Sequence, residues 1–261
     1  MIARFIGRAL APAVLVVAGG GLAHAGIIAS AAVGGGASTG AILENFDSVP
    51  MGSANYTTRT GIALSFGSNA WALRGSVSGV AAAPYLSGSN GVGFGDGGSN
   101  QANGVDTSTY LAAGAAPGVS GASITMKLPQ YETYFGILWG SIDPYNALSF
   151  YNGDKLVAMF TGRDIIASAN GNQGADGTMY VNFNANGGTE FNTVVASSDG
   201  YSFEFDDVAF NDTAFTADGV DTSLISHSIP VSPMAAVPEP VTLSMLATGL
   251  FGLGLVRRRR A

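Results

Sequence analysis

The central part of the sequence predicts an all-β fold. Short segments with an apolar residue at every second position recur along it, and no segment sustains the 3.6-residue period of a helix. Glycine, with 38 residues, is well above average usage, and clusters of Gly, Ser, Asn and Asp separate the segments as turns. Strands joined by turns without helical crossovers predict an antiparallel, jelly-roll-like β-sandwich, with a barrel as the alternative.

The first half of this region gives few strands. The expected strands there are residues 41–46, 61–66 and 71–77. In the second of these, Ile62, Leu64 and Phe66 share one face. Residues 81–118 consist mostly of Gly, Ala, Ser and Asn, so we expect long loops there with one or two strands.

The second half gives clearer patterns. The expected strands there are residues 122–128, 133–142, 147–151, 154–160, 178–183, 190–196 and 201–206. Residues 133–142 are apolar on both faces, which predicts a central strand. Asn152-Gly153 predicts a β-hairpin, because both residues tolerate positive φ between two apolar runs. A turn is expected at Pro129-Gln130.

The N-terminus has the three regions of a secretory signal peptide. Arg4 and Arg8 give a basic start, residues 9–21 are small and apolar, and Ala23 and Ala25 flank His24 as a small-x-small cleavage site. An N-terminal transmembrane helix is the weaker alternative, because the apolar run is short and rich in Gly and Ala.

The C-terminus predicts a membrane anchor. Residues 241–256 carry no charge, and as a helix they would span roughly 24 Å, slightly less than a hydrocarbon core of ~30 Å. Four basic residues follow and would stay cytoplasmic, because each is costly to move through the bilayer. These stop-transfer residues are Arg257, Arg258, Arg259 and Arg260.

The anchor follows Pro238-Glu239-Pro240, and this order resembles the sorting segment of PEP-CTERM proteins. The resemblance implies cleavage near the motif by an exosortase, a membrane transpeptidase, and delivery of the ectodomain to the cell surface. An anchor that is never processed is the alternative. Residues 134–153, 160–162 and 180–183 are also similar to a subgroup of exosortase-dependent surface proteins, which implies an exported β-domain and no assigned chemistry.

These patterns divide the chain into five parts. They are a signal peptide (1–25), a flexible leader (26–40), a β-sandwich ectodomain (41–212), a linker (213–236) and the sorting segment (237–261). We expect signal peptidase to cleave the N-terminus and exosortase to process an inner-membrane-anchored intermediate. The mature protein is then expected on the outer surface or in the extracellular matrix of a Gram-negative bacterium.

Net charge limits the classes of binding partner that we expect, and cysteine content limits how the fold can be stabilised. Between residues 26 and 236 there are five basic and 17 acidic residues, a net charge of −12. Such a surface repels nucleic acid and anionic lipid, and it favours solubility and divalent cations. The chain has no cysteine, so core burial must stabilise it without disulfides.

The residues for most catalytic chemistries are missing from the expected body. Its one histidine, His227, falls in the expected linker, and no HExxH or phosphate-loop motif occurs. The glycines of residues 91–97 resemble a GxGxxG motif, but no helix is expected to follow, so a flexible turn is the preferred interpretation. We therefore expect a protein that is not an enzyme and has no cofactor apart from a structural Ca²⁺.

That Ca²⁺ site is a hypothesis from three carboxylates. Asp206 and Asp207 are adjacent, so in a regular strand they point to opposite faces, and Asp207 shares the face of Phe203 and Phe205. The order of Glu44, Asp47 and Asp207 is similar to that in carbohydrate-binding jelly rolls in which an early acidic segment and an acidic last strand share one Ca²⁺. Solvated acids at two strand ends are the preferred alternative.

Three functions remain open. The first is a non-enzymatic surface or matrix protein associated with the envelope, biofilm or exopolysaccharide. The second is a lectin-like domain that binds polysaccharide through exposed aromatic residues, although most candidates lie in strands and favour the core. The aromatic candidates are Trp71, Tyr131, Tyr134, Trp139, Tyr145 and Tyr151. The third is a glycoside hydrolase with two converging carboxylates.

Overall fold

A computed structural model describes residues 26–94, 100–114, 120–213 and 227–230. The expected signal peptide and the sorting segment, with its motif and arginines, lie outside these residues. Within the described part, no helix is long and apolar enough to cross a membrane.

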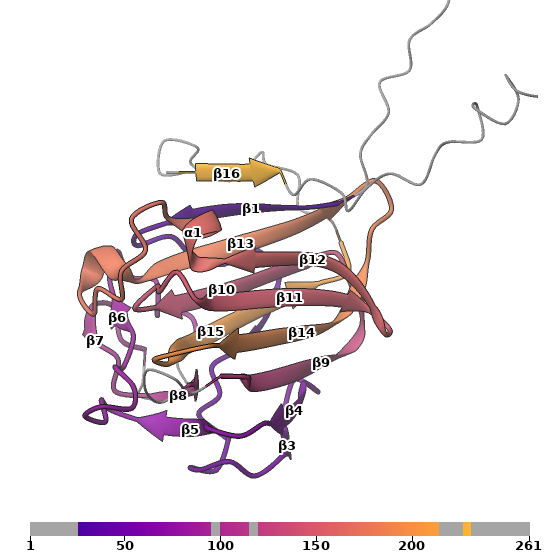
Figure 1. The fold of residues 1–261 in the computed structure, drawn as a ribbon. Coiled ribbons are helices and arrows are strands. Elements are labelled where there is room, and N and C mark those ends of the chain that lie inside the picture. The colour runs from indigo at the N-terminus through magenta and orange to yellow at the C-terminus, as the bar shows by residue number, and fades with distance from the viewer. Residues whose placement is uncertain (1–25, 95–99, 115–119, 214–226, 231–261) are drawn as a thin grey trace, which may run out of the picture.

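The described chain is all-β, as expected, and its strand pairs are antiparallel. Figure 1 shows two large sheets lying face to face. The larger sheet has the order β16 (His227–Pro230), β1 (Gly26–Ala32), β13 (Met179–Asn186), β10 (Tyr134–Gly140), β15 (Phe203–Asn211), β8 (Thr109–Ala113) and β5 (Ala70–Arg74), and β2 (Ile42–Glu44) also pairs with β15.

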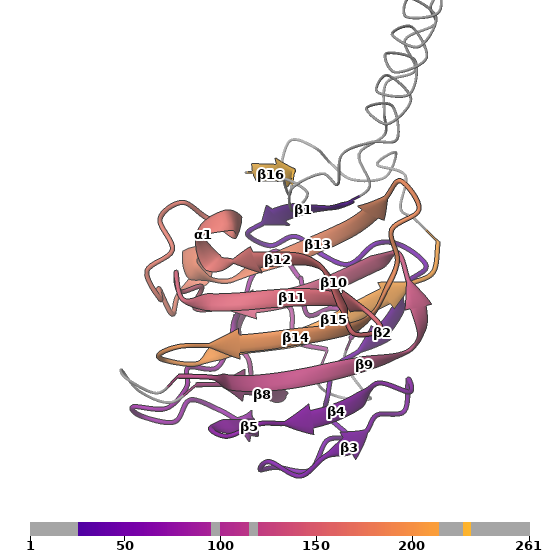
Figure 2. The same cartoon turned by 45° about the vertical axis from the view of Figure 1, so that its right-hand side comes forward.

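The second sheet lies in front in Figure 2. Its order is β12 (Lys155–Thr161), β11 (Asn146–Asn152), β14 (Phe191–Ser198), β9 (Ala122–Glu132), β4 (Ala63–Phe66) and β3 (Tyr56–Thr57). The remaining elements are a small pair, β6 (Tyr85–Leu86) with β7 (Gly104–Val105), one helical turn, α1 (Gly162–Ile165), and a 3-10 turn, η1 (Ala175–Gly177).

Aromatic rings join the two sheets. Phe150 of β11 lies 4.9 Å from the ring of Phe183 in β13 and 5.9 Å from that of Phe135 in β10. Within the larger sheet, Trp139 of β10 stacks on Phe203 of the neighbouring strand β15 at 4.2 Å, and both belong to the same core. These side chains are fully buried, so the space between the sheets is the main hydrophobic core and the arrangement is β-sandwich-like.

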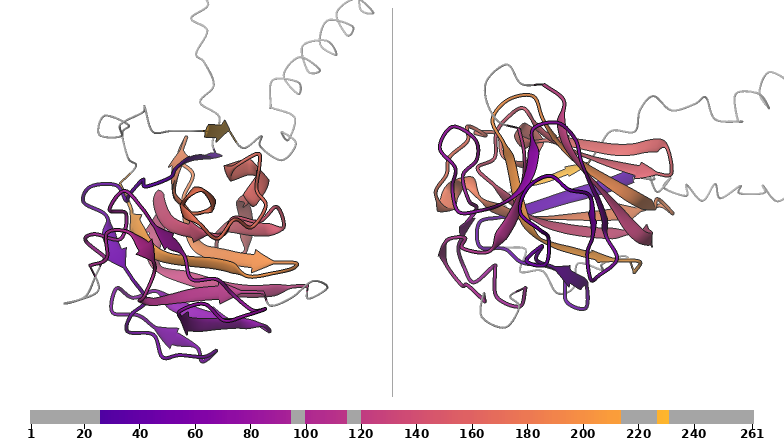
Figure 3. Two further views of the ribbon diagram at one scale, coloured as in Figure 1. Left: turned by 90° about the vertical axis from the view of Figure 1, so that its left-hand side faces the viewer. Right: turned by 90° about the horizontal axis from the view of Figure 1, so that it is seen from below.

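Loops cover part of the outer face of the larger sheet. Leu138 and Tyr180 point away from the main core and pack with Leu86 and Phe94 from the segment that follows β5. Tyr110 and Ala112 of β8 pack in the same way under Ala81 and Ala83. Figure 3 shows this early part of the chain, in indigo to purple, gathered on one side of the sheets. Both faces of the central strands are therefore buried.

The strongest sequence patterns are confirmed. Ile124, Met126 and Leu128 of β9 are buried in alternation, and β10 is buried along its whole length at the centre of its sheet. β11 and β12 form the expected hairpin, but its two turn residues are Gly153 and Asp154. Asn152 is the last residue of β11 and pairs with Lys155, and of the expected pair only Gly153 has positive φ, +57°. The region 81–118 holds three short strands rather than one or two.

Three expectations differ from the structure. Residues 26–32 were expected in a flexible leader but form β1, which buries Ile27, Ala29 and Ala31 on the core side; small residues hid this strand because Ala and Gly have low β propensity. The turn expected at Pro129 is absent, because β9 runs to Glu132 and Pro129 falls in a bulge where the pairing with β14 shifts. Residues 227–230 of the expected linker form β16, paired with β1.

Glu132 is a buried carboxylate at the end of β9. It is 0 % exposed, and burial, with the nearby Asp212 carboxylate, raises its pKa from 4.5 to about 7, although Gln130 partly opposes the shift. The folded state disfavours the charged form of Glu132. The free energy of unfolding therefore falls as the pH rises from 4.5 to 7, and this loss stays constant above pH 7.

We expect Glu132→Gln to stabilise the protein at pH 8 by about 1–2 kcal/mol, after allowing for partial screening by solvent. The gain should shrink as the pH falls toward 4.5, where the wild-type carboxyl is protonated in both states. Urea unfolding at several pH values measures this difference. Glu190→Gln, which changes an exposed acid, is the matched control and should show no such trend. An equal effect of Glu132→Gln at every pH would contradict the assignment.

Candidate functional site

An open cleft of about 570 Å³ lies at one end of the larger sheet. Three connections form its walls: residues 76–82 after β5, residues 141–145 between β10 and β11, and residues 170–173 after α1. The start of β15 completes it with Tyr201, Ser202 and Glu204. Loops positioned by a rigid sheet are a common place for binding residues.

Glu204 lies at the bottom of the cleft and is 3 % exposed. The backbone N–H of Ala82 donates to its Oε1 at 2.8 Å, and the Ser141 hydroxyl donates to its Oε2. Burial raises the pKa of Glu204 to about 8, although these two hydrogen bonds oppose the shift. At neutral pH this carboxyl is therefore mostly protonated, and both of its oxygens are held by the protein.

A second carboxyl, Asp143, lines the same cleft. Burial raises its pKa, and the phenol of Tyr145 opposes the shift. Gly171 packs directly against it: a Cβ added there would lie 2.8 Å from Asp143 Oδ1 and 2.9 Å from Oδ2. The backbone N–H of Asp143 donates a hydrogen bond to Asn146 Oδ1 at 3.0 Å. The aspartate is thus fixed in place between the two connections.

Two tyrosines and two side-chain amides also line the cleft. Tyr145 is half-buried, with its ring against Gly200, and Tyr201 is 46 % exposed. Asn170 and Gln173 lie on the opposite connection. The cleft therefore combines aromatic surface with hydrogen-bonding groups, which is the composition of a site for a polar, neutral ligand.

The other aromatic candidates have different positions. Trp139 and Tyr134 are buried, as expected for residues in strands, while Trp71 and Tyr151 are half-buried. Tyr131 is 46 % exposed on β9, outside the cleft. Tyr201 is the first residue of the strand expected at 201–206, but it precedes β15 and stays exposed.

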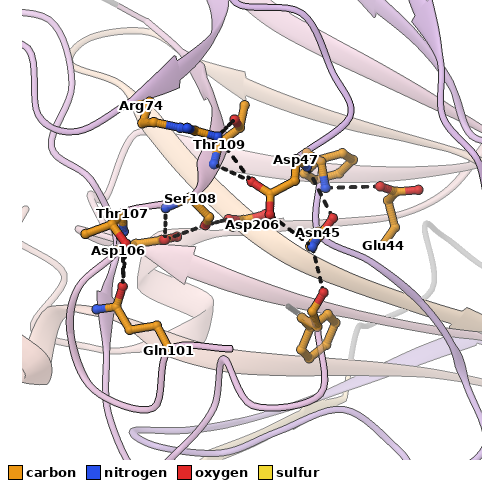
Figure 4. Close-up of polar contacts among 12 residues, drawn as sticks. Glu44, Asn45, Asp47, Arg74, Gln101, Asp106, Thr107, Ser108, Thr109 and Asp206 are labelled. Carbon is orange, nitrogen blue, oxygen red and sulfur yellow. Dashed lines mark hydrogen bonds and ion pairs between the residues drawn. The ribbon is translucent and has the colours of Figure 1, made fainter. Parts of the chain in front are cut away.

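A second polar site lies further along β15. We call it the aspartate cluster and define it by Asp47, Asp106, Asp206 and Asp207, of which the first three are labelled in Figure 4. Asp206 and Asp207 do not point to opposite faces as expected. The pairing of β15 with β10 shifts at this point, and Asp207 has φ of +48°, so a bulge turns both carboxyls toward the same loops.

The three residues expected to bind Ca²⁺ are not all brought together. Asp47 and Asp207 line one small cavity. Glu44 lies to the side in Figure 4, where its Oε1 accepts from the backbone N–H of Phe46 and its Oε2 from the Thr60 hydroxyl. Asp106 lines this cavity instead of Glu44, and no sequence pattern marks it, because it follows a two-residue strand in a loop-rich region.

The cluster does not have the geometry of a finished metal centre. Within residues 26–94, 100–114 and 120–213, no group of three or more His, Cys, Asp or Glu side chains surrounds one point at ligand distance. Of the remaining sequence candidates, residues 91–94 form a turn that buries Phe94, and the backbone of His227 lies in β16. Ala23, Ala25, Pro238, Glu239, Pro240 and Arg257 to Arg260 are outside the described residues.

No family model, no curated protein and no solved structure matches this chain.

We expect Gly171→Ala to lower stability more than Gly75→Ala. Both glycines have nearly the same φ, +70° and +69°, so the backbone strain is matched at about 1–2 kcal/mol. Only Gly171 faces a carboxylate, whereas a Cβ at Gly75 meets nothing within 4 Å. Urea unfolding should give an additional loss of about 1 kcal/mol for Gly171→Ala. Equal losses would show that Asp143 moves away freely and is not fixed.

Proposed function

We propose that this chain is an exported surface or matrix protein whose jelly-roll-like body binds polysaccharide in the cleft. Export and sorting are inferred from the two ends of the sequence, with signal peptidase and exosortase as the processing enzymes. Saccharide binding is inferred from one observation: Tyr145 and Tyr201 lie in the same open cleft as hydrogen-bonding side chains.

The cleft suits a sugar for physical reasons. Sugar rings present C–H faces that pack on aromatic rings, and their hydroxyls need both donors and acceptors. Asn170 and Gln173 supply both, Asp143 accepts, and a protonated Glu204 lowers the negative charge at the bottom of the cleft. The volume of about 570 Å³ is in the usual range for a small-molecule site and leaves room for a few sugar units.

Glycoside hydrolysis is the second candidate, because Asp143 and Glu204 are two carboxyls in one cleft. A raised pKa at Glu204 is the property of a general acid. However, both Glu204 oxygens already receive hydrogen bonds from the protein, whereas a general acid must present its proton to the ligand. The arrangement therefore favours binding over hydrolysis.

The sorting proposal predicts a defined C-terminus. Protein isolated from its native host should end near Pro238, and protein from a host without its exosortase should keep Arg257 to Arg260. Mass spectrometry of the intact C-terminus measures the difference. Native protein that keeps its arginines in the presence of the enzyme would contradict processing.

The binding proposal predicts that Tyr201→Ala weakens affinity for the exopolysaccharide of the host roughly five- to tenfold, as expected for the loss of one aromatic contact of about 1 kcal/mol. Tyr131→Ala is the matched control, because Tyr131 is equally exposed, at 46 %, and lies outside the cleft. Affinity electrophoresis with the native polymer measures both. Equal effects of the two substitutions would contradict the cleft as the binding site, and release of new reducing ends would favour hydrolysis.

A further inference from the structure

The aspartate cluster concentrates negative charge in a buried place. Asp106 is 2 % exposed, Asp206 is 0 % exposed and Asp207 is 5 % exposed. Arg74 approaches the cluster, but its guanidinium is 3.7 Å from Asp47 and its side chain is 59 % exposed. A buried arrangement of like charges costs stability unless something compensates it.

Hydrogen bonds within the protein satisfy only part of the cluster. Asp47 accepts from the Thr109 N–H and the Asn45 side-chain amide, Asp206 Oδ1 accepts from the Asp207 N–H, and Asp106 Oδ1 accepts from the Ser108 N–H. The Ser108 hydroxyl contacts both Asp106 Oδ1 and Asp206 Oδ2, the latter at 3.1 Å, but it has one proton for the two acceptors. Asp106 Oδ2 is buried and has no hydrogen-bond partner. No described residue donates to the Asp207 carboxylate; the hydrogen bond from the Tyr180 phenol goes to the Asp207 carbonyl.

The unsatisfied oxygens face a cavity of about 10 Å³. Its walls include Asn45, Asp47, Asp106, Ser108 and Asp207, which come from three segments far apart in the sequence. A space of this size holds about one water-sized particle. Its polar lining consists of carboxylate, amide and hydroxyl groups, and oxygen ligands of this mixed kind are those of Ca²⁺.

The backbone is also strained at this point. Asp207 has φ of +48°, a conformation that costs a non-glycine residue energy and is kept only where the surroundings require it. The bulge that contains it turns Asp206 and Asp207 toward Asp106 rather than to opposite faces.

We propose that the aspartate cluster binds one Ca²⁺ ion, with Asp106, Asp207 and Asp47 as its carboxylate ligands. Asn45 and Ser108 line the same cavity and supply further oxygens. Since the three carboxylates do not surround one point in the structure, small side-chain rotations of Asp106 and Asp207 complete the site. The ion joins β2, the loop before β8 and β15, and so fixes the loops over the outer face of the larger sheet. This site is separate from the cleft, and its test does not depend on saccharide binding.

The test is thermal unfolding of the full chain, purified in detergent, with Ca²⁺ alone, with Mg²⁺ alone and with EDTA. At a Ca²⁺ concentration about 100 times the dissociation constant, the Tm should rise by roughly 5–10 °C relative to EDTA. Isothermal titration calorimetry should give one Ca²⁺ per chain. Mg²⁺ should produce a smaller shift, because the site offers flexible mixed ligands rather than a regular octahedron.

Two variants make the result specific. Asp106→Asn and Asp207→Asn should each abolish the Ca²⁺-dependent shift, and each should have a higher Tm than the wild type in EDTA, because a repelling charge is removed. Asp154→Asn, which changes an exposed acid in the β11–β12 turn, is the control and should keep the full shift. The proposal is overturned if Ca²⁺ and EDTA give the same Tm for the wild type, or if the cluster variants respond to Ca²⁺ as the control does.

Discussion

The burial of both faces of β15 is the constraint on which the rest of the structure depends. Its core side contributes Phe203 and Phe205 to the space between the sheets. Its other side carries Glu204 and Asp206, which a solvated sheet face would leave in water, but here they are almost fully buried. Loops must therefore cover this face and also provide hydrogen bonds for its carboxyls. This explains why the glycine-rich early half of the chain, which has little regular structure of its own, packs against the larger sheet.

Both candidate sites follow from that constraint, and the acids of β15 have two different kinds of surroundings. Glu204 has enough hydrogen-bond donors, because the Ala82 N–H and the Ser141 hydroxyl donate to its two oxygens. Asp206 and Asp207 lie beside further acids. Asp206 accepts from the Asp207 N–H and the Ser108 hydroxyl, but Asp106 Oδ2, on the loop that covers them, has no hydrogen-bond partner. A buried acid with sufficient donors can be explained by structure alone, whereas a buried group of acids with too few donors needs a proton or a cation. For this reason the two sites, only a few residues apart along one strand, have different proposed ligands.

The sequence predicts the parts of this fold that alternate strongly and misses those that depend on backbone irregularity. The period of β9 and the hairpin between β11 and β12 are local patterns, and both are found, although the hairpin turn falls one residue later, at Gly153 and Asp154. The bulge at Asp207 is not local, because it arises where β15 must pair with β10 and also turn its charges toward loops from elsewhere in the chain. Reasoning from a regular strand therefore places Asp206 and Asp207 on opposite faces. Asp106 is missed for a related reason: its role comes from a contact across 100 residues with Asp206, and no short-range pattern marks it.

A short strand, β16, pairs along β1 at the edge of the larger sheet. β1 consists mainly of small residues and pairs on its inner side with β13, so its other edge would present free backbone groups to neighbouring molecules. β16 pairs along this edge, with Ala31 opposite His227 and Ile28 opposite Pro230. Proline has no N–H to donate, so it suits the end of a short edge strand. A segment that composition marks as a tether therefore pairs with the sheet at residues 227–230 and protects its edge.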